Sequence, residues 1–171
     1  MWTPRTETRT ELLERALVTC VEMVTDRGFE VQMASADHDP ALVAMRGDEK
    51  LHVVFHPEDK VGVKAVRALQ TEMEAQGVTR VLLVSTDGPT PFTKKELAED
   101  HSIEFWTIAK LAINITKFDI VPRHSLVSRE EEAELRTRYH VSSDREWPKL
   151  PRADPVCRYY DYPVGRLVRI D

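Results

Sequence analysis

The spacing of apolar residues switches along the chain between the period of a helix and the period of a strand. This switching is the feature that most limits what the chain can fold into. Seven apolar residues between Leu12 and Val24 recur at the spacing of one helix face, and residues 29–33 then alternate apolar and polar side chains as a half-buried strand does. The pattern continues along the chain, with strands expected at 51–55, 78–85 and 102–108 and a helix at 62–76. Strands that alternate with helices are typical of an α/β layer structure, and the lack of a helix between 30 and 55 favours a mixed sheet.

Local signals predict where several helices begin and end. Thr8 and Glu11 have the spacing of a capping box, and Gly28 is a typical residue just past a helix end. Thr93 and Glu96 have the same capping-box spacing, and we expect them to begin a short helix after a turn rich in glycine and proline.

The last third of the chain differs in composition. Half of the ten prolines lie there, and the formal charge is −6 over 1–112 but +1 over 113–171. We therefore expect two domains, an α/β domain at 1–112 and a small α+β domain at 113–171.

Three elements are expected in the second domain. Ser128 begins a helix, on whose apolar face we expect Leu135, and Asp154 with Pro155 begins another. Residues 166–170 alternate as a strand, and we expect one more strand just before Pro122.

Composition excludes several classes of protein. The formal net charge of −5 argues against a dedicated nucleic-acid binder with a basic face. No apolar run approaches the roughly 20 residues of a membrane span, and the charged first residues predict no secretory signal. The two cysteines, Cys20 and Cys157, are too few for a disulfide framework and are expected to be reduced thiols.

Motifs for catalysis, cofactors or metals are lacking. No two of the six glycines lie close enough for a phosphate-binding loop. Ser125 follows His124, but adjacency in sequence does not make a nucleophile and its base. His52 and His56 would lie about 13 Å apart on a strand, too far to share a metal ion. We therefore expect no catalytic, cofactor-binding or metal-binding residue.

One group of acidic residues leaves an alternative function open, that of a metal-dependent nuclease. Metal-dependent nucleases place one acidic residue on a strand and an acid-x-lysine triplet at the end of the next, to hold Mg²⁺. Asp39 or Asp48 could be the first acid, and Glu58-Asp59-Lys60 follows the strand expected at 51–55. Because charged residues make up 31% of the chain, such triplets are frequent by chance, and a solvated turn is favoured.

Several blocks of the sequence resemble one known family. The blocks of the last third lie at 114–116, 120–124, 150–156 with Tyr159, and 165–170. They are similar to the assembly domain of the fifth-largest shared subunit of eukaryotic nuclear RNA polymerases, which has a smaller counterpart in the archaeal polymerase. Residues 22–29 and 61–64, and the pair Thr90-Pro91, resemble the jaw domain that only the eukaryotic and virus-encoded versions carry.

The resemblance implies a non-catalytic subunit of DNA-directed RNA polymerase. Its jaw domain would have a nuclease-like fold without nuclease chemistry and would form part of the lower jaw near downstream duplex DNA. Its carboxy-terminal domain would dock on the largest subunit, near the small sixth subunit, with transcription factors as further partners. The implied DNA-proximal residues are Thr90, Pro91, Lys94 and Lys95, and the implied interface residues are Pro122, Arg123, His124, Asp154, Pro155 and Arg158.

Two departures from the family pattern bear on the source of the chain. The region between Gly28 and Val61 is short, and the chain stops at Asp171, before the family's last strand. These departures suggest a large DNA virus or a divergent protist, and hence a location in the nucleus, or in a viral factory or virion. A free Mg²⁺-dependent nuclease and a standalone adaptor for transcription factors are the alternatives.

Overall fold

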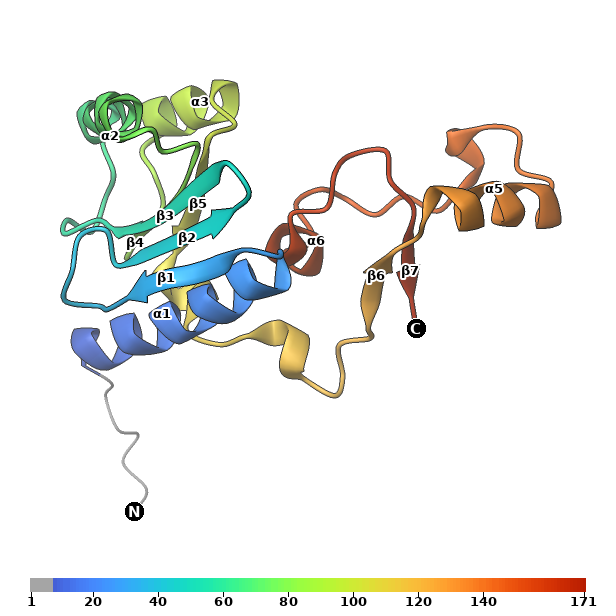
Figure 1. Cartoon of the computed structure of the whole chain (residues 1–171), viewed down its shortest axis with the longest axis horizontal. Helices are drawn as coiled ribbons and strands as arrows, with labels where there is room; N and C mark the ends of the chain where they lie inside the picture. Colours follow the sequence, from blue (N-terminus) through green and yellow to red (C-terminus); the bar gives the residue numbers. More distant parts are fainter. Residues whose placement is uncertain (1–7) are drawn as a thin grey trace, which may run out of the picture. The chain divides into compact units, whose positions relative to one another are not determined.

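The computed structural model describes residues 8–171, so the expectation about a secretory signal lies outside the described residues. The chain divides into two compact units, one up to Ile113 and one from Asn114 (Figure 1). None of the helices formed by the described residues is long and apolar enough to cross a membrane.

The first unit is a five-stranded mixed sheet with helices. Its elements are α1 (Arg9–Asp26), β1 (Glu30–Ala34), β2 (Leu42–Arg46), β3 (Glu49–Phe55), α2 (Val63–Gln76), β4 (Arg80–Ser85), α3 (Pro91–Glu99), β5 (Ile103–Thr107) and α4 (Ile108–Leu111). The strand order is β1-β2-β3-β4-β5, with the pairs β1–β2 and β2–β3 antiparallel and the pairs β3–β4 and β4–β5 parallel. The expected mixed α/β sheet is therefore confirmed.

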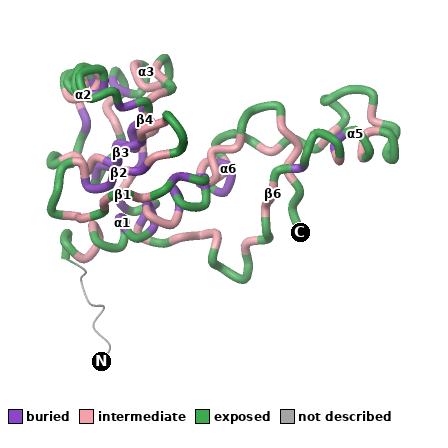
Figure 2. Tube along the Cα trace, viewed as in Figure 1, coloured by how far each residue is buried: buried purple, intermediate pink, exposed green. Residues whose placement is uncertain are grey.

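Burial on both faces explains the apolar run of β4. Val81 and Leu83 pack with Val66 and Met73 of α2 in one core cluster, while the alternate residues Leu82 and Val84 are also buried. A strand covered on both faces has no polar side to alternate with. Figure 2 shows buried residues of this unit on β2, β3 and β4 and on α1.

Two features of the first unit differ from the sequence prediction. β2 was not predicted; it forms a hairpin with β3 through Gly47, whose φ of 58° suits the tight turn. Thr93 does not begin α3: Thr90 is its N-cap, accepting the Thr93 backbone N–H, and Pro91 is the first helical residue. The capping-box prediction at Thr93 was wrong, because Thr93 lies within the helix and not at its start. Its side chain is buried.

The second unit is small and contains a two-stranded antiparallel sheet, β6–β7. Its elements are η1 (Ile115–Lys117), β6 (His124–Leu126), α5 (Arg129–Arg138), η2 (Asp144–Glu146), α6 (Pro155–Tyr160) and β7 (Val168–Ile170). Ser128 and Asp154 cap α5 and α6 through their side chains, as predicted.

Two predictions for the second unit were wrong. No strand precedes Pro122 among the described residues of this unit; a 3₁₀ turn lies there, and His124 itself begins β6. α5 has no apolar core face either: Leu135 is half-buried, and the helix's buried residue is Glu132.

Candidate interface surfaces

The start of α3 carries the residues predicted to lie near DNA. Thr93 fixes it to the loop between β3 and α2, because its hydroxyl donates to the Val61 carbonyl over 2.9 Å. Lys94 and Lys95 are exposed in the first turns of the helix, and the neighbouring Phe92 is 81% exposed. This helix end therefore presents two cations, an aromatic ring and the positive end of the helix dipole.

The segment from Pro122 to His124 is held by the β6–β7 ladder. The His124 Nδ1–H donates to the Pro122 carbonyl over 2.8 Å, since that carbonyl can only accept. The Tyr162 hydroxyl donates to the His124 carbonyl over 3.1 Å, and the Arg123 carbonyl accepts from the backbone N–H of Asp171. Pro122 and Arg123 are exposed, so a backbone fixed on one side presents these side chains outward.

Asp154, Pro155 and Arg158 belong to α6. The Asp154 carboxylate accepts from the backbone N–H groups of Val156 (2.9 Å) and Cys157 (3.1 Å), so it already serves as the helix cap. Pro155 is exposed and Arg158 half-buried.

The Tyr162–His124 hydrogen bond connects the chain just after α6 to the start of β6. The structure thus brings the end of α6 near His124, whereas the Asp154 side chain caps the start of α6.

Two of the nuclease candidates, Asp48 and Glu58, are not brought together. Asp48 lies in the turn before β3 and Glu58 in the loop after it, at opposite ends of a seven-residue strand, which is roughly 20 Å. Asp59 is exposed and forms an ion pair with Arg9 at 3.8 Å. Within residues 8–171, no three metal-ligating side chains gather as a site would require.

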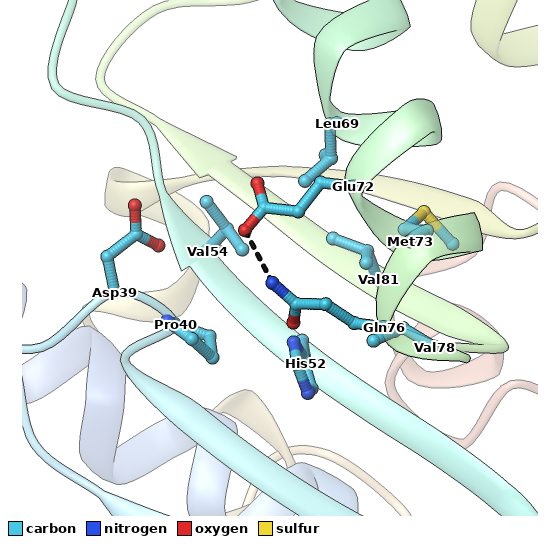
Figure 3. A pocket seen from close by; sticks show the side chains of 10 residues that line it. All are labelled: Asp39, Pro40, His52, Val54, Leu69, Glu72, Met73, Gln76, Val78 and Val81. Atoms are coloured by element: carbon cyan, nitrogen blue, oxygen red, sulfur yellow. Dashed lines mark hydrogen bonds between the residues drawn. The ribbon is translucent and has the colours of Figure 1, made fainter.

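A small pocket beside β3 holds the other candidates, Asp39 and His52 (Figure 3). Its volume is about 10 Å³, room for about one water molecule. Burial lowers the pKa of His52, helped by the Lys50 charge and opposed by Asp39. Glu72, across the pocket, accepts from Gln76 at 2.8 Å. Neutral imidazole and carboxylates are common metal ligands, but within residues 8–171 no three such side chains gather, so this pocket is not a metal centre.

Family models and curated relatives match the chain. Residues 113–171 match the family model "RNA polymerase Rpb5, C-terminal domain", and residues 14–114 match "Restriction endonuclease". The chain is 35% identical over 165 residues to "DNA-directed RNA polymerases I, II, and III subunit RPABC1" of Caenorhabditis briggsae, which covers 94% of this chain and 77% of the relative. Identity to the Caenorhabditis elegans subunit of that name is 32%, covering 96% and 90%. The chain belongs to the RPABC1 (Rpb5) family. It is also 30% identical to "DNA-directed RNA polymerase V subunit 5C" of Arabidopsis thaliana, covering 91% of this chain and 75% of that subunit.

The similarity to RPABC1 subunits and the match to the restriction-endonuclease family model both include the first unit. The match at 14–114 covers the mixed sheet and its helices, while Asp48 and Glu58 of this RPABC1-family chain lie at opposite ends of β3. The nuclease alternative is therefore not favoured.

One charged cluster of this RPABC1-family chain was not predicted as a unit. Glu132 is 6% exposed and accepts hydrogen bonds from Arg129 (3.1 Å) and Arg136 (2.8 Å). Arg136 also pairs with Asp144. The pKa of Glu132 is lowered, first by the hydrogen bond from Arg136. The spacing of Arg129, Glu132 and Arg136 on one helix face could have indicated this cluster.

Proposed function

We propose that the chain is a non-catalytic structural subunit of a multisubunit DNA-directed RNA polymerase. The observation that carries the proposal is the similarity to RPABC1 subunits along almost the whole chain, including 90% of the length of the Caenorhabditis elegans subunit. The separation of the acidic candidates in the first unit agrees with a role in assembly rather than in cleavage.

We assign assembly to a carboxy-terminal domain at 113–171, with the largest polymerase subunit and the small sixth subunit as partners. The buried residues of this part are few: Val127, Glu132, Val156, Cys157 and Tyr159. Phe118 and Ile120, close to Pro122, are 46% and 89% exposed. A thin core beside exposed apolar side chains suits a domain that completes its burial against another protein.

Proline and local hydrogen bonds support the assigned interface residues. Pro122 and Pro155 fix backbone angles before docking, which lessens the ordering entropy lost on binding. Arg123, His124, Asp154 and Arg158 add polar groups around them. We therefore retain these six residues as the docking surface for the largest subunit.

We assign the domain at 1–112 to the lower jaw, where Thr90, Pro91, Lys94 and Lys95 approach downstream duplex DNA. The exposed lysines and the helix start suit phosphate contacts. The net charge of the chain suits few such contacts and no dedicated DNA-binding face. The proposed location is the nucleus, or the viral factory or virion if the source is a virus.

Co-purification tests the proposal. The full chain, tagged and expressed in its source, should recover the two largest polymerase chains in stoichiometric amount. Recovery of transcription factors without polymerase would favour the standalone adaptor instead.

Point variants then test the docking surface. His124→Ala and Arg158→Ala should reduce incorporation into the polymerase, while Arg138→Ala, an exposed cation of α5 outside the surface, should not. Val156→Ala is the fold control, because truncating this buried residue costs about 2 kcal/mol. If His124→Ala and Arg158→Ala lower the melting temperature as Val156→Ala does, these residues hold the fold and the interface assignment is wrong.

A further inference from the structure

Two threonine hydroxyls at the start of α3 form a hydrogen-bonded chain whose direction follows from its last acceptor. The Thr93 hydroxyl lies 2.9 Å from the Val61 carbonyl oxygen and 2.8 Å from the Thr90 hydroxyl. A carbonyl oxygen only accepts, and a threonine hydroxyl has a single proton, so Thr93 donates that proton to Val61. The Thr90 hydroxyl therefore donates to the Thr93 oxygen.

The Thr90 side chain is committed to the helix by this arrangement. Its oxygen accepts the Thr93 backbone N–H over 3.3 Å, and its one proton points to the Thr93 oxygen. Phosphate oxygens only accept hydrogen bonds from protein donors. The Thr90 hydroxyl thus has no proton to offer a DNA phosphate, although the residue lies in the region assigned to DNA.

The carbonyl at the end of the chain of hydrogen bonds belongs to a core residue. Val61 is fully buried and packs in one cluster with Val66 of α2 and Val81 of β4. Its carbonyl also accepts the Thr90 backbone N–H over 3.4 Å. Both the cap residue and the buried Thr93 are therefore attached to one oxygen that the core holds in place.

The loop that contains Val61 is held at two further points. Arg9 of α1 donates to the Pro57 carbonyl over 2.8 Å, and the Asp59 carbonyl accepts the backbone N–H of Asp87 over 2.8 Å. The loop is thus bonded to α1 on one side and to the segment before α3 on the other. First turns of helices tend to fray, and these bonds oppose fraying of α3.

The first turns of α3 present cations that do not stabilise the helix. Lys94 and Lys95 are exposed, and the first turn of α3 contains no acidic residue. Positive side chains near a helix amino terminus are disfavoured by the helix dipole. Contact with an anion is therefore the favourable interaction that remains for these two lysines.

We propose that Thr90 and Thr93 are positioning residues for the DNA contact, whereas Lys94 and Lys95 make the contact with phosphate. The two hydroxyls keep the first turn ordered before binding, which lessens the entropy lost when the lysines engage DNA. The inference rests on the proposed DNA contact at the start of α3. It divides that site into residues that hold the backbone and residues that touch the nucleic acid.

Retention of duplex DNA by the assembled polymerase tests the role of Thr93. Thr93→Val keeps the branched shape but lacks the hydroxyl, and should weaken retention about threefold at fixed salt. Thr93→Ser keeps the hydroxyl and should stay within about twofold of the wild type. The matched control is Thr79→Val, because the Thr79 hydroxyl also bonds a distant carbonyl, that of Lys50, over 2.9 Å. Thr79→Val should stay within about twofold as well.

A background without the lysines separates positioning from contact. When Lys94→Ala and Lys95→Ala are already present, neither Thr93→Val nor Thr90→Val should weaken DNA retention further, because a residue that acts through the lysines has nothing left to position. A residue that touches DNA itself would still weaken retention in that background.

Hydrogen exchange in the free full-length chain tests the ordering role without a polymerase. The Lys94 backbone N–H donates to the Thr90 carbonyl over 2.8 Å, in the first turn of α3. Thr93→Val should speed exchange of this amide at least about threefold and leave the amides of β4 unchanged. Thr79→Val should not affect the Lys94 amide.

Three results would overturn the proposal. They are equal DNA retention by Thr93→Val and Thr79→Val, loss of retention by Thr90→Val that is as large without the lysines as with them, and unchanged exchange of the Lys94 amide in Thr93→Val. If Lys94→Ala with Lys95→Ala leaves retention unchanged, the proposed DNA contact fails and the inference fails with it. An effect of the lysines without an effect of Thr93→Val overturns the inference alone.

Discussion

Replacing Glu104 by glutamine should destabilise the first unit by several kcal/mol. Arg27, at the end of α1, donates two hydrogen bonds to the Glu104 carboxylate of β5, at 2.9 and 3.3 Å. The Arg27 side chain is 1% exposed and that of Glu104 20% exposed. The pair therefore fastens the first helix to the last strand of the sheet from within the fold.

The magnitude follows from what the substitution leaves behind. Arginine stays charged, and removing one partner of a buried ion pair costs about 3–5 kcal/mol. Since Glu104 is partly exposed, we expect the lower end, about 3 kcal/mol, and a melting temperature lower by on the order of 15 °C for a unit of this size. Glutamine keeps the volume and an oxygen for the Trp106 indole N–H, which now donates to Glu104 over 2.8 Å, so no cavity contributes.

Urea unfolding followed by circular dichroism measures the loss. The exposed pair Arg46–Glu49, with side chains 43% and 45% exposed, provides the matched control, and Glu49→Gln should cost less than about 1 kcal/mol. The double variant Arg27→Met with Glu104→Gln should recover much of the lost stability, because it removes the stranded charge and keeps an oxygen for the Trp106 indole N–H. The reasoning is refuted if Glu104→Gln costs no more than Glu49→Gln, or if the double variant is as unstable as Glu104→Gln.

Three further outcomes are expected. Lys94→Ala with Lys95→Ala should flatten the logarithmic salt dependence of DNA retention by the assembled enzyme by at most about 1.8; an unchanged slope contradicts the assigned DNA contact. The isolated chain should not nick plasmid DNA with Mg²⁺ or Mn²⁺; cleavage abolished by Glu58→Ala would restore the nuclease alternative. Because Arg136 and Arg129 lower the pKa of Glu132, its ionised form stabilises the fold above about pH 4.5 and loses this effect as pH falls through the lowered pKa. The melting temperatures of Glu132→Gln and wild type should therefore converge in acid, and a constant gap across pH would contradict this.

Elements set by short-range hydrogen bonds were predictable from the sequence. Thr8 with Glu11 begins α1, Ser128 begins α5 and Asp154 begins α6, each by a bond that spans three residues or fewer. Such bonds depend on little beyond the local sequence. The boundaries of these helices were therefore predicted closely.

Features decided by distant residues were not predictable in the same way. Thr93 has the spacing of a cap, but its hydroxyl bonds to Val61, 32 positions away, and the residue lies inside α3. Glu58 and Asp48 formed a plausible set only until the hairpin of β2 and β3 separated them.

The two units obtain their stability in different ways, and this bears on their roles. The first buries a sheet on both faces, with β4 covered along Val81–Val84, and can keep a nuclease-like fold without using it for chemistry. The second leaves Ile120 89% exposed and buries few apolar side chains. A unit of this kind gains most of its remaining burial when a partner covers it. Partner binding should therefore protect the amides around His124, in the proposed docking surface, from hydrogen exchange far more than those of β4, which the fold already protects.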